Sequence, residues 1–288
     1  MSYRLSNQMP NQVRQEEKPE EGKRKFFFVV EGEKTECIYV RGIANHANKN
    51  ALLDVILLER MKSSESNQYK ITSTIKNYIE KTEKLSEQQI IELNDLMLDF
   101  EEETVDEISV INKIAEIIGD DINFFLEERT NNVIDQLKAL EKLITYEKGH
   151  DKICLILDRD YRSFTASQYD EVLTICQQSD FILGISNPNF EFYLFLHIND
   201  ASKIDKETII RNPKMTKGKN SIKYTERLLK DELKCFDEKY SKNKFNVDFF
   251  ISNFDKFLKN IENFSQDNNV LKDEIGSSVH HIIKQVIQ

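Results

Sequence analysis

Two aspartates, two positions apart, follow a run of five apolar residues near the middle of the chain. The run Ile153-Cys154-Leu155-Ile156-Leu157 leads directly into Asp158 and, after one residue, Asp160. Such a run is typical of a strand buried on both faces of a parallel sheet, and open α/β sheets bind ligands where their strands end. Neighbouring carboxylates repel each other there, so a divalent cation would compensate them. The alternative is a capping aspartate in a solvated turn.

A second apolar run ends in the same way. Residues 25–30 lead into Glu31, with Gly32 permitting a tight turn, before Lys34, Thr35 and Glu36 begin a helix. Two parallel strands that each end in an acid bring Glu31, Asp158 and Asp160 around one point. Oxygen ligands of this kind suit Mg²⁺ or Mn²⁺ rather than zinc.

The elements that must position these acids are read from hydrophobic periodicity. Apolar runs predict strands over 25–30, 52–58, 153–157 and 181–186, with helices over 35–47 and 168–178. The order strand, helix, strand predicts an α/β fold with a parallel sheet flanked by helices.

The segment after the fourth strand adds a further acid. Pro188 suits the first turn of a helix capped by Asn187, and Glu191 then lies one turn from the strand's end, where it could reach the metal site. His197, at the far end of this helix, is either a histidine satisfied by a carbonyl or a proton donor.

The remaining segments are predicted to be helical. Residues 61–149 read as an all-helical insertion whose acidic run, 95–107, is either a solvated face or a surface that mimics nucleic acid or docks a basic partner. Stripes over 249–261 and 271–287 predict one helix each. We therefore divide the chain into a disordered tail (1–24), a core (25–60 and 150–288) and the insertion (61–149).

Composition limits the classes of function. The 288 residues contain no apolar run long enough for a membrane span, and the polar N-terminus lacks the apolar centre of a signal peptide. Four scattered cysteines fit reduced thiols in a cytoplasmic protein. A net charge of −10 argues against broad electrostatic binding of nucleic acid. The one basic stretch, 211–219, is either a solvated loop or a phosphate contact.

Three motifs together resemble the RloB-like family, Toprim-fold proteins found in bacterial defence loci beside restriction-modification genes or ATPases. They are the strand ending in Glu31-Gly32-Glu33-Lys34-Thr35-Glu36, the strand ending in Asp158-Arg159-Asp160, and Ser186-Asn187-Pro188-Asn189-Phe190-Glu191 followed by Leu194-Phe195-Leu196-His197. The resemblance covers about 25–59 and 150–288, including Ile275–Val279, which looks like the start of the family's closing helix. The chain departs from the family in its insertion, and in Asn189 and Tyr193, where members often carry cysteine and tryptophan.

The resemblance implies a Toprim metal centre for phosphoryl transfer. Glu31 would bind metal or act as a general acid or base, and Asp158 and Asp160 would hold Mg²⁺ or Mn²⁺. Glu36 and Glu191 would complete a second metal site, as in the related overcoming-lysogenization-defect nucleases. Lys34 would neutralise the charge that develops on the scissile phosphate.

Three functions are compatible with these residues. The leading expectation is a metal-dependent nuclease that acts as an effector of anti-phage defence, on DNA or on RNA such as tRNA, with an ATPase partner and compatible with a homo-oligomer. The second is a regulatory or scaffold subunit of an ATPase-containing complex, docked through the acidic insertion. The third, a phosphotransferase or primase-like enzyme, ranks last because the sequence has no P-loop or glycine-rich nucleotide cradle.

Overall fold

A computed structural model describes residues 23–30, 34–57, 68–102, 105–118, 142–160, 164–215 and 221–288. Its five strands form one sheet in the order β2-β1-β3-β4-β5. The first four are parallel, and the last pairs antiparallel with β4. The α/β prediction is confirmed, but the sheet is mixed rather than wholly parallel. The strands are β1 (Arg24–Val30), β2 (Ala51–Leu57), β3 (Lys152–Asp158), β4 (Ile182–Asn187) and β5 (Gly276–Ser277).

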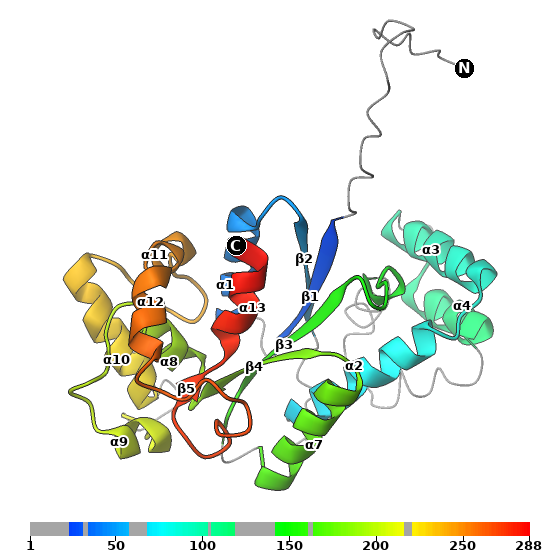
Figure 1. Cartoon of the computed structure of the whole chain (residues 1–288). Helices are drawn as coiled ribbons and strands as arrows, with labels where there is room; N and C mark the ends of the chain where they lie inside the picture. The colour runs from blue at the N-terminus through cyan, green and yellow to red at the C-terminus, as the bar shows by residue number, and fades with distance from the viewer. Residues whose placement is uncertain are drawn as a thin grey trace, which may run out of the picture.

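Alternate residues of β1 face two different hydrophobic cores, as expected for a strand buried on both sides. Phe26 and Phe28 belong to a cluster that includes α1 (Thr35–Ile43) and α13 (Val279–Ile287). Phe27 and Val29 belong to a second cluster. That cluster includes α2 (Gln68–Thr82) and α7 (Ala166–Gln178). Helices therefore cover both faces of the sheet (Figure 1).

The region expected to be an insertion supplies two different kinds of helix. The helix α2 packs on the sheet through Ile71, Ile75 and Tyr78. The pair α3 (Glu87–Glu101) and α4 (Glu107–Ile118) buries a small core of its own and stands beside the main body in Figure 1. The predicted tail, up to residue 22, and residues 61–67, 103–104 and 119–141 of the predicted insertion lie outside the described residues.

The C-terminal half is helical, as predicted, but its boundaries differ. The stripe over 249–261 forms two helices that part at Asn253, whose side-chain Nδ2 donates to the Phe249 carbonyl at 2.8 Å. The elements of this half before α13 are α8 (Phe190–Phe195), α9 (Lys206–Arg211), α10 (Tyr224–Leu233), the 3₁₀ turn η2 (Lys234–Phe236), α11 (Val247–Ser252) and α12 (Phe254–Ile261); a second 3₁₀ turn, η1 (Ala44–His46), follows α1.

The closing helix begins at Val279, not at Leu271, because the preceding residues make other contacts. The side chain of Asn187 donates to the carbonyls of Leu271 and Glu274 at 3.0 and 2.8 Å. The short strand β5 then follows before the helix. Asn187 is thus the last residue of β4 rather than a helix cap, and Asn189 is the residue before α8. Within the described ranges, no helix is long and apolar enough to cross a membrane.

Candidate functional site

Two of the acids predicted from the sequence, Asp158 and Asp160, lie at the carboxyl end of the central strand β3. Strands β1 and β3 are parallel, with Val30 opposite Ile156, and Asp158 at the end of β3 lies opposite Ser186 in β4. The carboxyl end of β1 therefore lies beside that of β3. Glu31 itself, with residues 32 and 33, lies outside the described residues, so its role stays a prediction.

Arg159 fixes the loop that carries the two aspartates. Its buried guanidinium donates to the carbonyls of Lys272 and Phe164 at 2.8 and 2.5 Å and lies over the rings of Phe164 and Tyr169. These two aromatic residues belong to the core on the α7 side of the sheet. Because side chains alternate along an extended chain, Asp158 and Asp160 are directed to the opposite side from Arg159.

Residues from other segments contact both aspartates. The carbonyl of Asp158 accepts a 3.0 Å hydrogen bond from the side chain of the buried Gln68, at the start of α2. The side chain of Asp160 is partly exposed, and Lys223 Nζ lies 3.9 Å from its Oδ2. A positive charge is thus already present beside the second aspartate.

Glu191 is buried, and both of its carboxylate oxygens have partners. Asn189 Nδ2 donates to Oε2 at 2.5 Å, while the Tyr240 hydroxyl and Lys242 Nζ approach Oε1 at 3.2 and 3.1 Å. Asn189 is itself held by the hydroxyl of Thr225, which donates to its Oδ1 at 2.9 Å. Buried charge is costly unless it is paired and hydrogen-bonded, and this network meets that requirement.

Tyr240 joins Glu191 to the start of α1. Burial raises the pKa of Tyr240 well above its usual value, and the charges of Glu191, Glu226 and Glu36 raise it further. The hydroxyl therefore stays protonated and donates a hydrogen bond to Glu191. Since that proton is used, the Thr35 hydroxyl donates to the Tyr240 oxygen across 3.1 Å. Lys34 is the exposed residue immediately before this helix.

Lys242 is influenced by three acids from separate parts of the chain. Burial lowers the pKa of Lys242, but the charges of Glu191, Glu226 and Asp158 together raise it above its usual value. The structure thus brings Glu36, Asp158 and Glu191 around the segment 240–242, and it places Asp160 beside Lys223.

The sequence did not single out Glu226, Tyr240 or Lys242. Glu226 lies in the first turn of α10, which is an ordinary position for an acid. Lys242 is one of four lysines between residues 234 and 244, and spacing alone does not distinguish it from the others. These residues are found only through the packing of the C-terminal helices against the sheet.

The donor set can be compared with what a hard cation requires. Carboxylates from Asp158 and Asp160, beside the point where β1 ends, are ligands of the kind that Mg²⁺ and Mn²⁺ prefer, so these residues fit such an ion. Glu191 differs, because its own chain already supplies it with three donors. In the part of the chain that the structure describes, no three His, Cys, Asp or Glu side chains form a ready-made metal cluster.

His197 lies deep in the hydrophobic core, away from the acids of the candidate site. Its side chain is fully buried, its Nδ1 lies 3.1 Å from the Tyr193 carbonyl, and burial lowers its pKa from 6.5 to about 3. Burial also lowers the pKa of a second buried histidine, His280, to about 3, and the charges of His281, Lys284 and His197 lower it further. The prediction that His197 is a helix-end histidine satisfied by a carbonyl fits this arrangement.

Both imidazoles are predicted to make stability depend on pH. In the unfolded chain a histidine takes up a proton below about pH 6.5, whereas these folded-state pKa values are near 3. Stability is therefore fully present above about pH 6.5 and is lost as the pH falls toward 3, by about 1.4 kcal/mol per pH unit for each histidine.

Urea unfolding at pH 7.5 and 5.5 measures this effect. The variant His197→Phe keeps an aromatic ring among Phe250, Phe254 and Phe257 and removes one of the two titrating groups. Its loss of stability between the two pH values should be smaller than that of the wild type by about 1.4 kcal/mol. Equal losses in the two proteins would contradict a neutral, buried His197.

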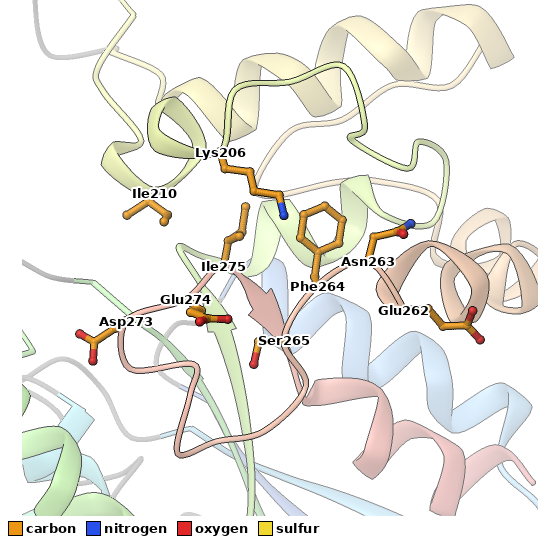
Figure 2. A pocket seen from close by; sticks show the side chains of 9 residues that line it. All are labelled: Lys206, Ile210, Glu262, Asn263, Phe264, Ser265, Asp273, Glu274 and Ile275. Carbon is orange, nitrogen blue, oxygen red and sulfur yellow. The ribbon is translucent and has the colours of Figure 1, made fainter.

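A separate pocket lies where α9 approaches the segments before β5. It has a volume of about 520 Å³, and Figure 2 shows Lys206, Phe264 and the acidic side chains around it. Three carboxylates, from Glu262, Asp273 and Glu274, outnumber the single lysine, whose Nζ lies 5.4 Å from the centre of the Phe264 ring. This excess of negative charge disfavours a phosphate ligand in the pocket.

Comparison with known proteins gives one match. A family model described as RloB-like protein matches residues 26–286, which is nearly the whole chain. No curated protein and no solved structure matches it. The match covers β1, β3, β4 and α8, the elements that carry the candidate acids.

Proposed function

Because the chain belongs to the RloB-like family, we propose that it is a metal-dependent nuclease of the Toprim type, acting as an effector of bacterial anti-phage defence. The observation that carries the proposal is the convergence of acids at one edge of the sheet. Asp158 ends β3 beside the point where β1 ends. The charges of Glu36 and Glu191 raise the pKa of Tyr240, and those of Glu191 and Asp158 raise the pKa of Lys242.

Each residue has a role that follows from its chemistry. Glu31, Asp158 and Asp160 are the residues that would hold Mg²⁺ or Mn²⁺. When bound, such an ion supplies Lewis acidity and lowers the pKa of water that attacks a phosphodiester. Glu31 would accept or return a proton as a general base or acid. Lys34, at the start of α1, would offset the negative charge that grows on the scissile phosphate.

Basic residues beside Asp160 favour a phosphodiester substrate over a neutral one. The backbone of Lys214 pairs with that of Lys223 in an antiparallel bridge, supported by a 2.9 Å hydrogen bond from Met215 to Ile222. The bridge joins Lys214, in the described part of the basic stretch 211–219, to a lysine that approaches the candidate site. This arrangement supports the reading of the stretch as a phosphate contact.

Replacing Lys223 by methionine should weaken binding of a single-stranded oligonucleotide and lower its dependence on salt. Removing one phosphate contact reduces the slope of log affinity against log salt by about 1. Fluorescence anisotropy over a series of KCl concentrations measures both quantities. A matched control is Lys234→Met, at the other end of α10, where the lysine pairs with Asp231 at 2.7 Å. Equal salt slopes for Lys223→Met and the wild type would contradict the assignment.

The net charge of −10 predicts weak binding of nucleic acid overall. The proposed enzyme therefore depends on a partner or on a structured substrate such as tRNA for its affinity. An ATPase from the same locus is the partner that the family context favours.

Glu31→Gln is the direct test of the proposed chemistry. Wild-type cleavage should require Mg²⁺ or Mn²⁺, stop in EDTA, and fall to background in the variant. Glutamine keeps the shape of the side chain but removes its negative charge and its ability to accept a proton. A wild type that cuts no nucleic acid, with and without its partner ATPase, would overturn the proposal.

A regulatory or scaffold role is the alternative, and one observation favours it. The helices α3 and α4 have their own small core and carry acids such as Asp95, Asp99 and Glu102, which suit a basic docking surface on a partner. In this case the chain should co-purify with its ATPase, and defence in cells should survive Asp158→Asn. Loss of defence in that variant would favour the nuclease.

A further inference from the structure

A cation from the chain itself occupies the space between two buried acids. Lys242 Nζ lies 3.1 Å from Glu191 Oε1 and 3.9 Å from Glu226 Oε2. The two carboxylates are only 5 and 8% exposed, whereas the Lys242 side chain is 46% exposed. The ammonium group therefore forms the boundary between two buried negative charges and the solvent.

The position of Lys242 is set by the backbone around it. Ser241 and Lys244 pair in an antiparallel bridge with hydrogen bonds of 2.9 and 3.0 Å in both directions, so Lys242 sits within a tight turn. Tyr240, which precedes the turn, is anchored by Glu191 and Thr35. Both anchors belong to the elements that frame the candidate site, so the turn and the acids are held together.

Glu226 has a partner on its other oxygen as well. Lys230 Nζ lies 2.6 Å from Glu226 Oε1, one helical turn along α10. Two carboxylates are thus matched by two lysines. In a nuclease with two divalent ions, a carboxylate such as Glu191 would be a ligand of the second ion.

We propose that Lys242 takes the place of a second divalent ion at this site, so that each chain holds a single metal ion, on the side of Asp158 and Asp160. The proposal rests on the proposed function and deepens it. An ammonium 3.1 Å from Glu191 repels a dication and covers the oxygen on which that ion would bind. Lys242 thereby supplies positive charge where a two-ion centre would use metal.

A lysine that served only as a structural ion pair would behave differently. Its loss would lower stability because two buried acids would lose a partner, but the number of bound ions would stay the same. A lysine that replaces an ion predicts that its removal frees Glu191 and Glu226 to bind one.

The test counts ions with Mn²⁺ as the probe, by calorimetric titration and by electron paramagnetic resonance of free Mn²⁺. The full-length wild type should bind one Mn²⁺, and Lys242→Met should bind two. Lys244→Met, in the same turn, is the control and should bind one, like the wild type. The double variant Glu191→Gln with Lys242→Met removes the buried charge together with its partner, and it should return to one.

The outcomes separate this inference from the proposed function. Two ions on the wild type, or one ion on a folded Lys242→Met, would overturn the inference and leave the nuclease proposal in place. If the wild type binds no ion, the proposed metal centre itself is excluded. If Lys242→Met fails to fold by circular dichroism, Lys242→Gln takes its place, because its polar side chain suits the 46% exposed position. It should bind two ions, and one ion on it would overturn the inference. A wild type that binds one ion but cuts no nucleic acid would contradict only the nuclease.

Discussion

The variant Asp158→Asn should cut nucleic acid more than about 100-fold more slowly than the wild type, with its fold intact. Residues that merely orient a metal ligand contribute about 10- to 100-fold to activity, and Asp158 is proposed as a ligand itself. Asparagine has the same shape and keeps the backbone contact between the Asp158 carbonyl and Gln68, so β3 should remain in place. Initial rates with Mg²⁺, together with a thermal melt, measure the two effects.

Asp180→Asn is the matched control for this variant. Asp180 lies in the turn before β4, and its side chain is 80% exposed and pairs with Lys152 at 2.8 Å. Its φ of 55° is a left-handed conformation that asparagine also adopts readily. The same chemical change there should leave the rate within about twofold of the wild type, because an exposed ion pair contributes about 1 kcal/mol or less. Equal loss of activity in both variants would contradict a specific role for Asp158.

Gly276→Ala should destabilise the whole domain strongly. A Cβ at this position would lie 1.9 Å from the carbonyl oxygen of Ser265, which is backbone and has little room to move. Ser265 also accepts the backbone N–H of Ser277 at 3.0 Å, so relief of the clash would displace β5 and the start of α13. Overpacking typically costs about 1–3 kcal/mol, and a backbone clash belongs at or above the upper end of that range.

The melting temperature of Gly276→Ala should therefore fall by roughly 5–10 °C. Gly149→Ala is the comparison, because its φ of 84° is also unusual but a Cβ there would meet no atom within 4 Å. That variant carries only the cost of a left-handed backbone at a residue with a Cβ, about 1–2 kcal/mol. Similar melting temperatures for the two alanine variants would show that the close approach to Ser265 does not constrain the fold.

Hydrophobic pattern sufficed to predict the four parallel strands of the sheet, but it missed β5, which lies in a stretch predicted to be helical. The runs that end at Val30 and Leu157 are buried on both faces, and each sends alternate side chains into separate cores. Such runs leave little choice of secondary structure, because a strand between two layers of helices must be apolar throughout. The prediction that two acids end β3 at the sheet's edge follows from the same pattern.

Helix boundaries that depend on contacts with residues far away in the sequence were not predictable in this way. The apolar residues from Leu271 onward have helical spacing, yet the helix begins only at Val279. The side chain of Asn187 donates hydrogen bonds to the carbonyls of Leu271 and Glu274, which are therefore not part of that helix. A side chain more than eighty positions away decides that boundary. Pro188 likewise suggested a helix start, but the chain extends to Asn189 before α8 begins.

The candidate site shows the same division. Asp158 and Asp160 follow a recognisable strand, whereas Lys242 is one lysine among several in a polar loop. Its pairing with Glu191 joins residues about fifty positions apart and requires the turn at Ser241 and Lys244. Sequence motifs mark the acids, and packing reveals the cation that neutralises them.

One assay tests the central claim most directly. Wild-type protein and Asp158→Asn are incubated with plasmid DNA, single-stranded DNA and total cellular RNA including tRNA, each with Mg²⁺, with Mn²⁺ and with EDTA, in the presence and absence of the ATPase partner. We predict that the wild type cuts at least one of these substrates with a divalent ion, and that EDTA and Asp158→Asn both abolish the cut. Cleavage that persists in EDTA, or that the variant performs as fast as the wild type, would contradict a metal-dependent nuclease built on this edge of the sheet.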